Sequence, residues 1–149
     1  MPARFRRLLT GSLLIVACLT GCGAASDAPV LAKVTGTVML DGKPLTKGSV
    51  QFLPDSSKGT TGRMALGEIG PDGDFSLTTT TPGDGAQVGF HKVSVTCVDA
   101  PPFDPKNPVP TTVKWLIPEK YGSEHTSGLT AEIKEGEENT VMLDLQSGK

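Results

Sequence analysis

The sequence predicts an all-β domain, organised as a single β-sandwich of seven strands. Seven short runs alternate between apolar and polar residues, which is the pattern of a strand buried on one face. Turn residues such as Gly, Pro, Asp and Asn separate these runs. The runs follow one another within about 110 residues, a spacing typical of a sandwich, and no convincing helical periodicity accompanies them.

The first four strands are expected at residues 34–40, 50–52, 62–69 and 75–77. The tetrapeptide Asp-Gly-Lys-Pro follows the first of them and predicts a turn in which Gly42 adopts a positive φ. The tripeptide Pro-Asp-Gly precedes the fourth strand and predicts a second turn, because proline presets φ and Gly73 accepts the left-handed position. We favour this plain turn over a calcium site, since two aspartates beside Gly73 fall short of a calcium loop.

The last three strands are expected at residues 90–98, 129–134 and 141–145. In the first of these, Val93, Val95 and Cys97 share one face of the strand. The final two runs flank a turn with three glutamates, so we expect them to form a hairpin with a solvated tip.

A proline-rich stretch, residues 99–112, lies between the strands expected at residues 90–98 and 129–134. It contains five prolines, which cannot donate to a ladder, and it is therefore expected to form a surface loop or an edge crossover. Phe103, Trp115 and Tyr121 lie in or beside it and are candidate partner-binding residues, because exposed aromatic side chains stack on sugars and anchor protein contacts. The simpler alternative is that Val113, Trp115 and Ile117 form one apolar face that packs the loop onto the sandwich.

The N-terminus has the features of an export signal. Arg4, Arg6 and Arg7 precede an apolar stretch at residues 8–19, and no acidic residue occurs before Asp27. As a helix this stretch reaches roughly 18 Å, well short of the ~30 Å hydrocarbon core of a membrane. Residues 1–21 are therefore predicted to be a signal peptide rather than a transmembrane anchor.

The signal ends in Leu19-Thr20-Gly21-Cys22, which resembles the bacterial lipobox. The resemblance implies a diacylglyceryl group on the sulfur of Cys22, cleavage between Gly21 and Cys22, and an acyl chain such as palmitate on the freed amine. Two or three chains on one residue would anchor the protein stably. The alternative is a chance cysteine within a signal peptide. We expect a lipoprotein of the cell envelope, held to a membrane outside the cytoplasm, with residues 22–33 as a flexible tether and residues 34–146 as the domain.

Loss of the signal peptide changes the charge and the cysteine count. The mature chain keeps 11 basic and 16 acidic residues, a formal charge of −5 instead of −2. No basic stripe remains, so a nucleic-acid partner is not expected. With Cys18 removed and Cys22 lipidated, Cys97 is the remaining free thiol and no intramolecular disulfide is possible.

Three segments in order, VTGTVMLDGKPLTKGSVQFLP, GPDGDFSLTT and TPGDGAQVGFHKVSV, resemble the carboxypeptidase regulatory-like domain. The resemblance covers most of residues 33–146 and implies a Greek-key β-sandwich of the transthyretin type, without catalysis. His91 departs from it, since the family usually has tyrosine at this position. The same fold hosts hydroxyisourate hydrolases, but their Tyr-Arg-Gly-Ser ending is absent from this sequence, which ends Leu-Gln-Ser-Gly-Lys.

The sequence offers no convincing catalytic or metal site. His91 and Cys97 share a strand face but lie about 20 Å apart along it, too far for a catalytic pair. Cys97 is most simply a core thiol, and His91 a semi-buried packing residue with one ring nitrogen bonded. We therefore expect a non-enzymatic binding or structural module, with an envelope protein or a polysaccharide as partner and no cofactor beyond the lipid. The alternatives are an accessory subunit or enzyme with a cryptic site, and an envelope protein without a specific ligand.

Overall fold

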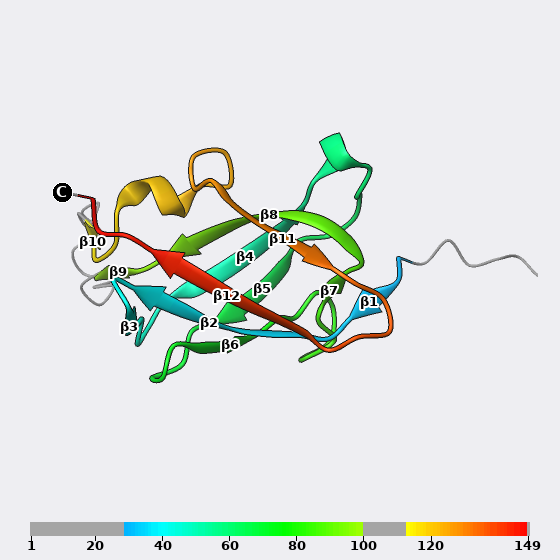
Figure 1. Ribbon diagram of the computed structural model, residues 1–149, viewed down its shortest axis with the longest axis horizontal. Coiled ribbons are helices and arrows are strands. Elements are labelled where there is room, and N and C mark those ends of the chain that lie inside the picture. Colours follow the sequence, from blue (N-terminus) through cyan, green and yellow to red (C-terminus); the bar gives the residue numbers. More distant parts are fainter. Residues whose placement is uncertain (1–28, 100–112, 149) are drawn as a thin grey trace, which may run out of the picture.

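The computed structural model describes residues 29–99 and 113–148, which form a β-sandwich without an α-helix among them (Figure 1). One layer, the β8 sheet, has the strand order β11 (Leu129–Ile133), β8 (Gly89–Thr96), β4 (Ser49–Pro54), β5 (Ala65–Glu68), all antiparallel. The other layer, the β2 sheet, is centred on β2 (Val34–Leu40). On one side β2 pairs in parallel with β12 (Asn139–Leu145), and on the other it pairs antiparallel with β3 (Lys43–Pro44) and β6 (Asp74–Ser76).

Two short strand pairs and two single-turn helices complete the described chain. β1 (Leu31–Ala32) pairs with β7 (Ala86–Gln87) at one end of the long axis (Figure 1). β9 (Val98–Asp99) pairs with β10 (Lys114–Trp115) at the opposite end, where the C-terminus also lies (Figure 1). The 3-10 helices are η1 (Ser56–Lys58) and η2 (Glu119–Gly122).

The seven expected strands are all present, and their apolar faces meet in one core. Phe52 of β4 and Phe75 of β6 come from different sheets, and their ring centroids are 6.1 Å apart. Val38, Val93 and Val95 are fully buried between the same layers. The two expected turns also form as predicted, with φ of 76° at Gly42 and 81° at Gly73. Alternation therefore identified the inward face of each long strand correctly.

The expected hairpin between the last two strands is wrong. β11 pairs with β8, whereas β12 crosses to the other sheet and pairs in parallel with β2. The side chain of Asn139 holds the connecting turn, accepting a hydrogen bond from Lys134 N (2.9 Å) and donating to Lys134 O (3.0 Å). Both strands bury their apolar face whether or not they pair with each other, so alternation and a turn do not determine the pairing partner.

The N-terminal boundary of the domain lies earlier than expected. The tether was expected to reach residue 33, but Leu31 and Ala32 form β1, and Ala32 belongs to the core. The predicted signal peptide with its expected Gly21–Cys22 cleavage site, and residues 100–112 with Phe103, lie outside the described residues. In the described part, no helix has the length and apolarity needed to cross a membrane.

Candidate binding surface

The two candidate aromatic residues in the described part are packed against the domain. Tyr121 is only 5% exposed, and its hydroxyl accepts a hydrogen bond from Gln146 N at 3.0 Å. Trp115 is half-buried and packs against the core. Ile117 is buried in the same core, but Val113 is exposed and does not continue the expected apolar face. Tyr121 therefore does not provide the exposed aromatic surface considered from the sequence, because folding buries its ring and bonds its hydroxyl to the last strand's end.

His91 is fully buried rather than semi-buried. Its ring lies against Phe52, with centroids 6.0 Å apart, and Nδ1 is 3.2 Å from the carbonyl oxygen of Gly89. Nε2 is buried without a hydrogen-bond partner among the described residues. Burial lowers the pKa of His91, because desolvation disfavours the imidazolium, and the hydrogen bond to Gly89 opposes this only in part.

Acid should destabilise the protein through His91. The unfolded chain binds this proton more readily than the folded one, so stability falls as pH drops below about 6.5, the ordinary pKa of histidine. We expect His91→Phe to flatten the stability profile below about pH 6.5, measured as urea unfolding midpoints. His125→Gln is the matched control, because that side chain is 74% exposed. An unchanged slope in His91→Phe would contradict the assignment.

Within the described residues, the remaining histidine and thiol do not come together at one site. Cys97 is buried in the core, and burial raises the pKa of its thiol. His125 lies instead on a surface loop, with Nε2 3.4 Å from Oε1 of Glu124. Across residues 29–99 and 113–148, no three His, Cys, Asp or Glu residues gather in a way that suits a metal ion.

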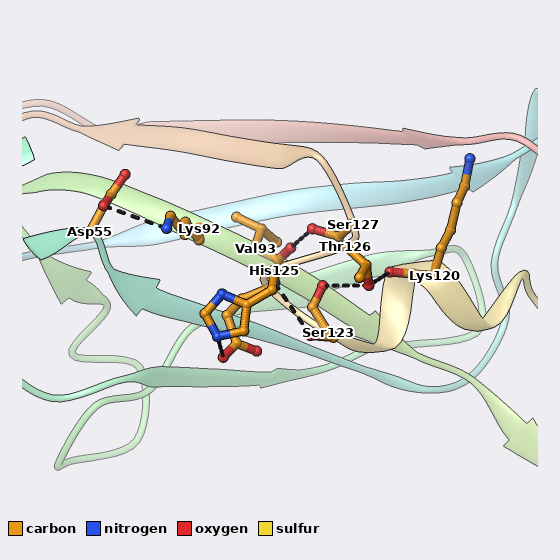
Figure 2. Close-up of polar contacts among 9 residues, drawn as sticks. Asp55, Lys92, Val93, Lys120, Ser123, His125, Thr126 and Ser127 are labelled. Atoms are coloured by element: carbon orange, nitrogen blue, oxygen red, sulfur yellow. Dashed lines mark hydrogen bonds and ion pairs between the residues drawn. The ribbon is translucent and has the colours of Figure 1, made fainter. Parts of the chain in front are cut away.

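The segment at residues 117–127 covers part of the outer face of the β8 sheet. Figure 2 shows Ser127 donating its hydroxyl hydrogen bond to the carbonyl oxygen of Val93, which fastens the segment to β8. Within it, Thr126 Oγ1 donates to Lys120 O at 2.6 Å (Figure 2). Ser94 points away from the core, yet it is only 2% exposed, because it lies with Glu124 at a small hollow beneath this segment. The outer face of β8 is therefore covered at Ser94.

The β4 and β5 half of the same face is open and forms a groove. The strand register places Ser94, Gln51 and Leu66 side by side across β8, β4 and β5, and it places Ser49 beside Glu68. The groove has a volume of about 770 Å³, and we call it the β4–β5 groove. The residues that line it include Ser49, Gln51, Leu66, Glu68, Thr78 and Pro82.

One wall of the β4–β5 groove is the loop at residues 78–84, which is held by the carboxylate of Asp84. Asp84 accepts backbone hydrogen bonds from Thr79, Thr80 and Thr81, at 2.7, 2.9 and 2.8 Å. Thr78 also exchanges two backbone hydrogen bonds with Leu66, both 2.8 Å long. These contacts hold the wall against β5, so the groove is built by the fold itself.

The groove and the hollow beside it contain apolar side chains that the core does not use. Leu66 is 47% exposed and Met64 is 48% exposed. Met64 and the partly buried Leu53 line a smaller adjoining hollow of about 50 Å³ that shares Gln51 with the groove. Sequence analysis missed this surface. The available signal was the unbroken apolar run Met64-Ala65-Leu66, in which Ala65 faces the core and its two neighbours face outward.

Comparison with known proteins leaves the chain without an assigned family. No family model matches the sequence, and no curated protein matches it. Among solved structures, the chain is similar to a 9R-lipoxygenase from Cyanothece PCC8801, with 16% sequence identity and a TM-score of 0.43. The similarity covers 78% of this chain but only 16% of the lipoxygenase chain.

Proposed function

We propose that this protein is a lipoprotein of the bacterial cell envelope, anchored through Cys22, which acts as a non-enzymatic binding module. The observation that carries the anchor is the sequence Leu19-Thr20-Gly21-Cys22, placed directly behind a basic and apolar export signal. Acyl chains on this residue would hold the domain to a membrane outside the cytoplasm.

The position of the domain supports this arrangement. The described chain begins at Pro29, seven residues after Cys22, and these residues span at most roughly 25 Å. The chain enters the sandwich through β1, at one end of the long axis, while β9 and β10 lie at the other end (Figure 1). In the anchored protein, the β1 end would lie near the membrane and the β9–β10 end would be presented away from it.

We also propose the finer fold assignment, a Greek-key sandwich of the transthyretin type related to carboxypeptidase regulatory-like domains. Two features support it beyond the order of sequence motifs. The first and last long strands, β2 and β12, pair in parallel within one sheet. Among the strands of the β2 and β8 sheets, taken in chain order, four connections cross from one sheet to the other. Crossing connections of this kind distinguish Greek-key sandwiches from simple meanders.

The β4–β5 groove supports a binding role. Apolar side chains that remain exposed beside polar groups in a hollow commonly mark a contact surface. The rigid sheet beneath them would present such a surface without requiring a reactive group.

The anchor is tested by the intact mass of the protein purified from its native host. We expect the mass of residues 22–149 plus two or three fatty-acyl increments and glyceryl. A polypeptide that keeps residues 1–21 and carries no acyl increment would refute the proposal.

A further inference from the structure

We propose that the β4–β5 groove binds an extended, positively charged polypeptide segment with aliphatic side chains, contributed by another protein. This inference rests on the binding role proposed above, but it does not depend on the lipid anchor. It follows from three properties of the groove, namely its apolar floor, its negative rim and a lining that includes none of the described aromatic residues.

The floor suits aliphatic side chains. Leu66 lies on the outer face of β5 next to Gln51 of β4, and about half of its surface is exposed. Met64 and Leu53 extend the apolar area toward the adjoining hollow. An extended segment projects every second side chain to the same face, so two or three aliphatic residues could reach this area together. The amide of Gln51 and the hydroxyls of Ser49 and Thr78 are placed to hydrogen-bond the segment's backbone.

The charged groups around the groove favour a cation. Glu68 lines the groove and Glu124 lines the adjoining hollow. Among the described residues, neither carboxylate is paired with lysine or arginine, and the ionic neighbour of Glu124 is His125. Lys92 is a cation on the same face, but its Nζ lies 3.9 Å from Oδ1 of the buried Asp55.

The same chemistry disfavours two other occupants. Sugar sites commonly use aromatic rings as stacking platforms, and none of the described aromatic residues lines the groove. A second copy of this chain is disfavoured as well, because the chain has a formal charge of −2, or −5 without residues 1–21, and would bring further carboxylates to a negative rim. A basic segment of a different protein, with aliphatic side chains, is complementary to both the negative rim and the apolar floor.

The test uses a fluorescein-labelled heptapeptide in which lysine alternates with leucine. Its fluorescence anisotropy is measured with the full chain purified from its host and held in phosphatidylcholine nanodiscs, with empty nanodiscs as the blank. We expect saturable binding that weakens from 50 to 500 mM salt. Leu66→Ser should weaken binding about tenfold, and Glu68→Gln about threefold.

The matched controls lie on the other sheet. Met142 is 70% exposed on β12, and Asp144 is exposed on the same strand, so Met142→Ser and Asp144→Asn should leave the affinity unchanged. Equal weakening by these controls would show that binding is nonspecific and would overturn the proposal. The proposal would also fail if the heptapeptide did not bind, if a glutamate-for-lysine version bound equally well, or if cellohexaose displaced it. A failure of this kind would leave the intact-mass result for the anchor untouched.

Discussion

Replacing Cys22 with serine should leave the protein as an unprocessed precursor without lipid. The thiolate of Cys22 is the expected acceptor of the diacylglyceryl group, and a serine hydroxyl is far less nucleophilic. Cleavage in the lipobox class requires this modification first, so the signal peptide should remain attached. Intact-mass analysis of membrane and soluble fractions measures both effects, and we expect complete loss of the acylated species.

Two matched controls separate lipidation from general loss of a cysteine. Cys18 lies within the predicted signal peptide, four residues before Cys22, so Cys18→Ser should be processed and acylated normally. Cys97 is a buried core thiol of the folded domain, so Cys97→Ser should also retain the lipid. Normal maturation of Cys22→Ser would contradict the proposed anchor. Loss of lipid in either control would show that lipidation does not depend on Cys22 specifically.

The strands were predictable because each buries one face against a single core. Val38 on β2 and Val95 on β8 are fully buried and were identified by alternation alone. Turn positions were equally local, since the positive φ at Gly42 and Gly73 depends on a few neighbouring residues. Pairing depends instead on which strand edges meet in space. The parallel pairing of Val141 with Gly36 joins residues that are far apart in the sequence, and no local pattern specifies it.

The candidate site was less predictable because it depends on what covers each outward face. Ser94 and Leu66 both point out of the core on the β8 sheet, but Ser94 is covered by the segment at residues 117–127 and Leu66 is open. Alternation shows which face of the sheet a side chain occupies, but it does not show whether another segment covers that face. Aromatic residues illustrate the same limit, since Tyr121 is polar enough for the surface yet is buried with its hydroxyl bonded to Gln146.

Replacing Gly36 with alanine should destabilise the domain more than most single changes in its core. Gly36 lies in the middle of β2, where a Cβ would overlap the carbonyl oxygen of Val141 and the ring of Phe75. Its φ is not in the left-handed region, so alanine would suit the backbone and the cost arises from packing alone. Neither neighbour moves easily, because Val141 belongs to the paired strand β12 and Phe75 packs against Phe52.

We expect Gly36→Ala to lose roughly 3 kcal/mol or more of unfolding free energy. This corresponds to a fall of more than about 10 °C in Tm for a domain of this size. Two other glycines distinguish the cost of a steric overlap from the cost of backbone strain. Gly42 has a φ of 76° and open space around it, so Gly42→Ala should cost about 1 kcal/mol from backbone strain alone. Gly148 has neither constraint, and Gly148→Ala should stay within about 0.5 kcal/mol of the wild type. If Gly36→Ala were no worse than Gly42→Ala, β2 and β12 would not approach as closely as the sandwich requires.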